Sequence, residues 1–408
     1  MLGETYLFAA IHHRSRNHIL KELALLTPQS PRKKSAAVVS LHFAYAHASH
    51  LFAYANAFMK LGFDVTLVLD EKYRSFISDS TLDGVQFIFT ENGSSVISPF
   101  DVALLYNSSP KNHRLARNLR SKGTTVLYVF HEPEPMWSMN VLRSEGLKKT
   151  IRFVGSSAFS ALTARASSRV IVCSEFGCRL YNSGYSWINR NVRIVPLVFN
   201  DEIGEARFQQ MRSEKHSFGF VGTACKSHGF IEFIQFAKHA LQNESRIPFL
   251  IATRTDITST LLADPEFAAF VETGRIRLIH GRELSNEEIN ACYLRCVCIW
   301  NVYRRSTQSG VLPRAYMAGT AVLAGRLGSF PEYVIPGVTG ELVELTAGPE
   351  ETLRVVNEIF KNQNVYIQGC RNSFLKTFWS EANVETLDKL LRETSSTPVL
   401  AQTPELVA

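Results

Sequence analysis

Short apolar runs alternate with segments of helical periodicity along most of the chain. In the first half, the runs that predict buried strands are 36–43, 64–69, 85–90, 102–106, 124–130, 167–173 and 192–198. Segments 51–61 and 111–120 have the apolar spacing of helices. Strands that are apolar throughout, and separated by helix-length segments, are typical of a parallel sheet covered on both faces. We therefore predict an α/β fold with a doubly wound domain over residues 36–205.

The same alternation restarts after a polar stretch at residues 201–215. Here strands are predicted at 218–221, 248–253, 276–280, 296–300 and 321–324, and helices at 230–241, 261–273, 286–294 and 311–318. We predict a second doubly wound domain over 206–380, and a C-terminal helix near 382–392 with a polar tail in 381–408. Residues 1–35 are interpreted as an N-terminal extension, with a helix at 7–26 and a linker. Ligands of such sheets bind outside the carboxyl ends of the strands, so two facing domains imply a cleft between them.

Composition narrows the class of protein. Of 408 residues, 45% are hydrophobic and 20% are charged, which excludes a disordered chain. The longest apolar runs fall far short of the ~20 residues that cross a bilayer, and no secretory signal is visible. The seven cysteines are scattered, which favours free thiols over disulfides or a metal site. We expect a cytoplasmic protein, either soluble or peripheral to the inner face of the membrane.

The formal net charge of +7 suits an anionic small molecule or an anionic membrane surface. It is too diffuse to indicate nucleic acid, and no base-stacking motif accompanies it. One basic strip stands out, and its members recur every three residues on the helix predicted at 111–120: Lys111, Arg114, Arg117 and Arg120. The strip is either a solvated face or a surface attracted to anionic lipid.

The most informative segment lies at residues 300–345. Gln308, Ser309 and Gly310 form a small-residue turn before a predicted helix. Gly310 permits close approach to the backbone, and the unpaired N–H groups of a first helical turn favour an anion. Gly319 then ends the helix before a buried strand. The turn alone fits either an anion site or an ordinary loop–helix–strand unit.

The segment from Arg314 through Gly319, followed by Gly328, Glu332 and Gly340, resembles the donor-site signature of family 4 retaining glycosyltransferases. The resemblance implies the GT-B architecture, two Rossmann-like domains facing across a cleft. It also implies transfer of a sugar from a nucleotide-sugar donor to a glycan or lipid-linked acceptor. It further implies retention of configuration, no metal and no cofactor, and a setting in surface polysaccharide assembly.

The resemblance also assigns roles to individual residues. His131 ends a strand where family members usually have a histidine that touches the donor sugar near the reacting centre, and His47 and His50 lie where the acceptor could be reached. The loop that opens the second domain corresponds to the family's diphosphate loop. The donor-binding positions are therefore predicted to be Gly222, Thr223, Lys226, Gln308, Ser309, Gly310, Val311 and Arg314.

The paired glutamates of the family are replaced here by Ser306 and Arg314. A guanidinium cannot accept hydrogen bonds from ribose hydroxyls, but it can bind phosphate or an acidic group on the donor sugar. Two other functions are weighed against glycosyl transfer. The missing glutamates would suit a non-catalytic glycosyltransferase-like partner subunit. A nucleotide-sugar epimerase of the same architecture would need cleft carboxylates, of which the sequence offers few.

Overall fold

The computed structural model describes residues 32–44, 47–77, 82–91, 99–107, 109–134 and 147–395. The described residues from Ser35 onward cluster into one compact unit. The helix predicted at 7–26 and the tail beyond residue 395 lie outside the described residues. Within those residues, no helix is both long enough and apolar enough to span a lipid bilayer.

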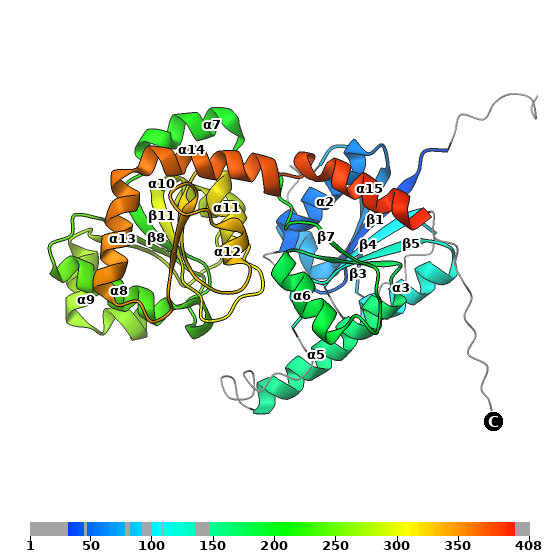
Figure 1. Ribbon diagram of the computed structural model, residues 1–408, viewed down its shortest axis with the longest axis horizontal. Coiled ribbons are helices and arrows are strands. Elements are labelled where there is room, and N and C mark those ends of the chain that lie inside the picture. Colours follow the sequence, from blue (N-terminus) through cyan, green and yellow to red (C-terminus); the bar gives the residue numbers. More distant parts are fainter. Residues whose placement is uncertain are drawn as a thin grey trace, which may run out of the picture. The chain divides into compact units, whose positions relative to one another are not determined.

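The first half of the compact unit forms a seven-stranded parallel sheet (Figure 1). Its strand order is β3-β2-β1-β4-β5-β6-β7, so the order reverses between β1 and β4. The strands are β1 (Ser35–Ser40), β2 (Asp64–Asp70), β3 (Gln86–Thr90), β4 (Val102–Tyr106), β5 (Thr125–Val129), β6 (Arg169–Val172) and β7 (Val192–Ile194). The helices are α2 (Ala48–Lys60), α3 (Pro110–Ser121), α5 (Leu147–Ala166) and α6 (Glu175–Gly184).

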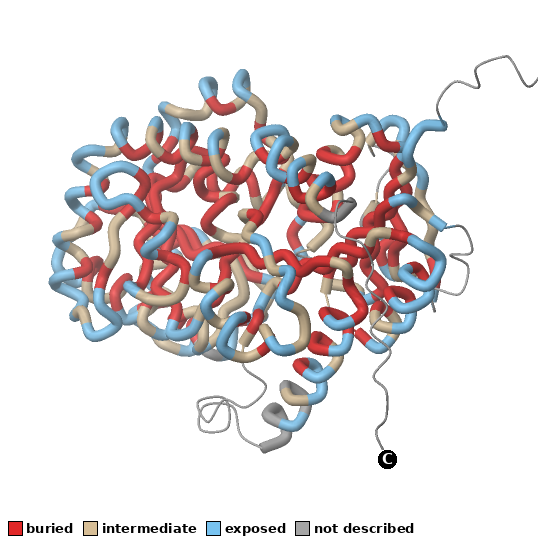
Figure 2. Tube along the Cα trace, turned by 45° about the vertical axis from the view of Figure 1, so that its right-hand side comes forward, coloured by how far each residue is buried: buried red, intermediate tan, exposed pale blue. Residues whose placement is uncertain are grey.

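Alternate residues of the central strand pack on opposite faces of this sheet. Ala36 and Val38 belong to the core under α2, whereas Ala37 and Val39 belong to the core under α3, α5 and α6. Figure 2 shows the buried strands inside and the exposed helix faces outside. A strand that is buried on both faces needs an apolar residue at every position, which explains why these strands read as continuous apolar runs.

The second half forms a six-stranded parallel sheet in the order β10-β9-β8-β11-β12-β13, which reverses between β8 and β11. Its strands are β8 (Ser217–Val221), β9 (Phe249–Ala252), β10 (Ile276–Ile279), β11 (Cys296–Asn301), β12 (Ala321–Gly325) and β13 (Gly340–Val343). The helices are α7 (Gly204–Met211), α8 (Phe230–Gln242), α9 (Pro265–Glu272), α10 (Asn286–Arg295), α11 (Val311–Met317), α12 (Phe330–Tyr333), α13 (Pro349–Lys361), α14 (Gln363–Ser373) and α15 (Val384–Ser395). The α/β prediction with two doubly wound sheets is confirmed. The domain boundaries remain a prediction.

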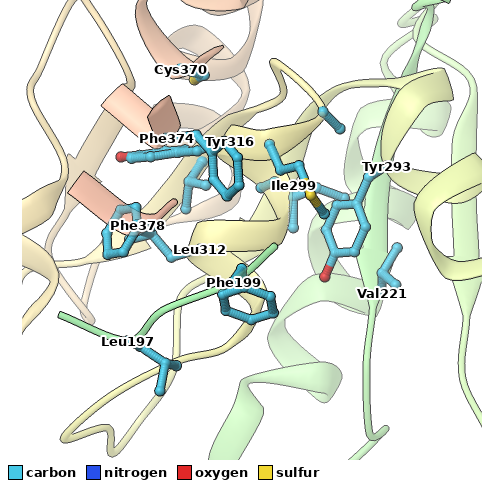
Figure 3. Packing of buried hydrophobic residues seen from close by; sticks show 14 of the residues in the cluster. Leu197, Phe199, Val221, Tyr293, Ile299, Leu312, Tyr316, Cys370, Phe374 and Phe378 are labelled. Atoms are coloured by element: carbon cyan, nitrogen blue, oxygen red, sulfur yellow. The ribbon is translucent and has the colours of Figure 1, made fainter. Parts of the chain in front are cut away.

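Two segments cross between the sheets and pair with each other. The segment after β7 carries Phe199, whose N–H donates to the Phe378 carbonyl at 2.8 Å. The N–H of Ser380 donates to the Phe199 carbonyl, also at 2.8 Å. Figure 3 shows Phe199, Leu312 and Phe378 as neighbouring buried side chains at this crossing. The second crossing takes α15 back to the first sheet, where it packs against α2.

Candidate functional site

A pocket of about 380 Å³ is lined by residues of both sheets. The lining residues follow the carboxyl ends of β1 and β5 in the first sheet and of β8 to β11 in the second. The pocket therefore lies beside the points where both strand orders reverse, which is where open α/β sheets bind ligands. All the site residues predicted from the sequence line it except Lys226.

The predicted turn immediately precedes α11, which begins at Val311. The Val311 N–H donates to Ser309 Oγ at 3.3 Å, and the Ser306 hydroxyl donates to the Gln308 carbonyl at 3.1 Å. Gly328 packs against the backbone just before this turn. It has φ +61°, and a Cβ on it would lie 2.0 Å from the Ser306 carbonyl oxygen. Only glycine fits that position, so the turn rests directly on another backbone segment.

Gln308 brings an unsatisfied acceptor to the pocket. Its side chain is only 8% exposed, and its Oε1 is buried without a hydrogen-bond partner in the described part of the chain. Buried polar atoms of native proteins are nearly always paired. The side-chain Oε1 of Gln308 is therefore positioned to accept a hydrogen bond from a hydroxyl or N–H group of a bound molecule.

The loop after β8 supplies a second wall of the pocket. The His228 ring donates from Nδ1 to the Thr223 carbonyl at 3.0 Å and stacks on Tyr303 at a centroid distance of 4.4 Å. Gly229 closes the loop with φ +67°, where a Cβ would lie 2.2 Å from the Val302 carbonyl oxygen. Lys226 is exposed in the same loop and is not among the residues that line the pocket.

Three histidines of the first sheet meet at the opposite wall. The ring centroids of His47, His50 and His131 lie 5.8 to 6.4 Å apart. The Tyr106 hydroxyl is 3.3 Å from Nδ1 of His131, and the Asn107 amide is 2.5 Å from Nδ1 of His47. The first turn of α2 and the end of β5 thus bring together three residues that are far apart in the sequence.

Burial keeps these rings neutral at pH 7. It lowers the pKa of His47 to about 3 and that of His131 to about 4. The pKa of His50 is lowered well below its usual value for the same reason. Nδ1 of His50 lies 3.1 Å from the Val198 carbonyl, which can only accept, so Nε2 is the unprotonated nitrogen. A Cβ on Gly310 would lie 3.9 Å from that Nε2, so His50 faces the predicted turn across the pocket.

The Arg314 side chain is held by groups of its own chain. Its Nη2 donates to Ser49 Oγ at 2.6 Å and to Asn286 Oδ1 at 2.9 Å. Its Nη1 donates to Asn290 Oδ1 at 3.1 Å and lies 3.4 Å from Glu202 Oε2. The guanidinium thus joins α2, α10 and the crossing segment at the edge of the pocket, rather than extending freely into it.

Several lining residues were not predicted from the sequence. They share one feature, a position at or just after a strand end, and they include Arg254, Glu283, Leu284 and Tyr303. That strand-end position is the signal that could have found them. Glu132 and Glu283 are the exposed carboxylates of the lining. Within the described residues, no group of three or more His, Cys, Asp or Glu side chains could hold a metal ion.

No family model matches the sequence, and no curated protein matches it. The fold of the chain does resemble those of solved structures. HepE from Anabaena in complex with UDP matches with a TM-score of 0.61 at 12% identity, covering 88% of this chain and 100% of that chain. The catalytic domain of starch synthase IV from Arabidopsis thaliana, bound to ADP and acarbose, matches with a TM-score of 0.61 at 10% identity, covering 90% and 100%.

WaaG, a glycosyltransferase involved in lipopolysaccharide biosynthesis, matches with a TM-score of 0.57 at 12% identity, covering 88% of this chain and 98% of that chain. These neighbours are glycosyltransferases of the GT-B fold. At such low identity the likeness is one of fold, and the predicted GT-B architecture is confirmed.

Proposed function

We propose that the chain is a glycosyltransferase that moves a sugar from a nucleotide-sugar donor to a glycan or lipid-linked acceptor. The observation that carries the proposal is the composition of the pocket wall: it contains ten of the eleven residues that the resemblance assigned, drawn from both sheets. The fold neighbours bound to UDP or ADP lend further support.

The donor is proposed to lie against the second sheet. There the turn at Gln308 to Gly310 and the loop at Gly222 and Thr223 form adjoining walls. Arg254 contributes an exposed guanidinium at the end of β9 and could meet the charge of a diphosphate. We propose that Arg254, rather than the predicted donor-binding residue Lys226, binds the diphosphate.

The proposed chemistry asks mainly for positioning and charge stabilisation. The bond between the anomeric carbon and the diphosphate oxygen breaks, and the acceptor hydroxyl bonds to that carbon on the same face. Configuration is retained because the new bond forms on the face that the diphosphate leaves. The acceptor proton passes to the leaving diphosphate, and no metal or cofactor takes part in the proposed step. Fixed dipoles and cations around the leaving group lower the barrier, and a glycosidase-like carboxylate pair is not required.

Within this proposal, His131 contacts the donor sugar as a neutral ring. Its low pKa means that it can exchange hydrogen bonds with sugar hydroxyls at pH 7 without carrying charge. His47 and His50 would meet the acceptor from the same wall. The surface polysaccharide setting is also proposed, and WaaG, with its role in lipopolysaccharide biosynthesis, supports it by likeness of fold alone.

The test is incubation of the purified full-length protein with uridine-, adenosine-, guanosine- and thymidine-diphosphate sugars, with and without EDTA. Slow hydrolysis or transfer of one sugar, unchanged by EDTA and giving a product of retained configuration by NMR, is expected. Epimerised donor would favour the epimerase. Absence of both binding and turnover for every donor would contradict the proposal and favour a non-catalytic partner subunit.

A further inference from the structure

Helices α3 and α5 carry the whole positive excess of the chain. Together they contain eight Lys and Arg and no Asp or Glu. The chain as a whole has a net charge of +7, so all its other residues sum to a net charge of −1. The two helices pack against each other on one face of the first sheet. Five of these eight cations have described side chains, and they are Lys111, Arg114, Arg117, Arg120 and Arg165.

A groove runs between these helices. One end is lined by Pro110, Arg114, Arg117 and Phe159, and the other by Arg117, Arg120, Leu162 and Arg165. We call this surface the α3–α5 groove. Among the residues that the structure describes, no acidic side chain lines either end. The described lining combines arginines with the apolar side chains of Phe159 and Leu162.

The structure divides the basic strip that the sequence predicted. Lys111 donates to the Glu91 carbonyl and lies 3.6 Å from Asp70, and Arg120 donates to the Ser167 carbonyl at 3.0 Å. Arg114 and Arg117 are exposed, and no ion pair involves either of them in the described part of the chain. The groove therefore presents Arg114 and Arg117 to solvent, with Arg165 added from α5.

Helix α5 exposes an apolar stripe beside these cations. Ile151 is 65% exposed and Leu162 is 41% exposed, and Ala158 lies exposed between them. The spacing of seven and four residues places all three on one helix face. Two large apolar side chains are thus exposed on the helix that also supplies Arg165.

We propose that the α3–α5 groove docks the protein on an anionic lipid bilayer. The arginines would meet lipid phosphates while Leu162 and Ile151 enter the boundary between headgroups and acyl chains, as amphipathic surfaces do. An acidic protein surface would satisfy the cations but would leave this apolar stripe without a reason to be exposed.

The groove is placed to serve the pocket. Pro110 at its near end is three residues beyond Asn107, whose amide contacts His47 in the pocket wall. A bilayer at the groove would therefore lie on the side of the pocket formed by the first sheet, where the acceptor is proposed to enter. This part of the inference rests on the proposed function, and it points to an acceptor anchored in lipid.

Vesicle co-sedimentation of the full-length protein tests the proposal. Binding is expected to phosphatidylcholine vesicles that contain phosphatidylglycerol, much weaker binding to phosphatidylcholine alone, and a loss of binding at high salt. The Arg114→Gln/Arg117→Gln variant should bind about 30-fold more weakly, because each of the two basic residues contributes roughly 1 kcal/mol near an anionic surface. Leu162→Ser should also weaken binding without any change of charge.

The matched control is Arg354→Gln/Lys361→Gln, which removes two exposed charges from α13 and should bind like the unchanged protein. Equal losses in the two double variants, or equal binding to neutral and anionic vesicles, would overturn the proposal. So would competition by inorganic phosphate, which would instead indicate a soluble phosphate ligand. Because no nucleotide sugar is present, failure here is distinguishable from failure of the proposed transferase activity.

Discussion

At the scale of single residues, the pocket combines neutral rings with one unsatisfied amide. His47 and His131 are neutral because burial lowers their pKa values to about 3 and about 4. The side-chain oxygen of Gln308, Oε1, has no hydrogen-bond partner among the described residues. Such a wall suits the hydroxyls of a sugar, which need hydrogen bonds of both directions but no charge.

These histidines predict a fall of stability with acid. In the unfolded chain each takes up a proton as the pH drops below about 6.5, whereas His131 in the folded protein resists until about 4. Stability present above pH 6.5 is therefore lost progressively toward pH 4. Urea midpoints measured from about pH 7 to about pH 5 should fall, and should fall less in His47→Gln/His131→Gln. An equal slope in the unchanged protein and in the double variant would contradict the account.

The sequence allowed us to predict which residues line the pocket, but not which contacts their side chains make. The order of Gln308, Ser309, Gly310 and the following helix was enough to place the turn. It could not show that Arg314 is held by Ser49 and Asn286, because those contacts depend on how two distant helices pack. Nor could it place Lys226 outside the lining, since the direction of a loop side chain is set by its neighbours.

At the scale of elements, the turn before α11 depends on a second backbone segment. Gly328 touches the Ser306 carbonyl and has a left-handed conformation that side chains rarely adopt. The turn is therefore stabilised by the packing of Gly328 against Ser306 as well as by its own hydrogen bonds. Strands with continuous apolar runs were readily predicted from the sequence. The edge strand β13 was not, because Gly340 and Glu341 interrupt its apolar pattern, and α5 was not, because its serines and glycine weaken the helical signal.

Gly328→Ala should destabilise the protein and loosen the turn. The added methyl would lie 2.0 Å from the Ser306 oxygen, so the backbone must move in addition to bearing the unfavourable φ. A cost of about 2–4 kcal/mol in the free energy of unfolding is expected from strain and clash together. Gly337→Ala is the control, since it has φ +76° but nothing within 4 Å of the added methyl, and it should cost only about 1 kcal/mol. Equal costs would contradict the role of the contact.

At the scale of the whole compact unit, polar contacts tie the two sheets together around the pocket. Arg305 after β11 pairs with Glu134 after β5, its Nε donating to Oε1 at 2.8 Å. Glu332 accepts from the N–H groups of Glu175 and Phe176 at the start of α6. Arg314 adds the contact to Ser49 described above. These contacts fix the two halves of the pocket wall relative to each other. They join residues that are far apart in the sequence, so no local pattern could have predicted them.

Arg314→Met should disturb both stability and the pocket. It removes the charged partner of Glu202 and the 2.6 Å hydrogen bond to the buried Ser49 hydroxyl. In the described part of the chain, these two side chains then keep only Asn290 and Asn286 as partners. A loss of about 2 kcal/mol in the free energy of unfolding is expected. Arg314→Lys keeps the charge but loses the planar guanidinium. Its free energy of unfolding should therefore lie between those of the unchanged protein and Arg314→Met. Denaturant unfolding of the three proteins gives the comparison. Unchanged stability in Arg314→Met would show that the bridge between the sheets is not held by this residue.

The central claim is that the diphosphate of a nucleoside diphosphate binds against the turn at Gly310. Calorimetric titration with nucleoside diphosphates tests it most directly. Gly310 has φ −69°, which any residue can adopt, and a Cβ there meets only ordinary contacts. Gly310→Ala should therefore fold and still bind, whereas Gly310→Trp should fold but fill the pocket and lose binding by about 100-fold or more. Binding retained by a folded Gly310→Trp, or absent from the unchanged protein for every base, would contradict the account.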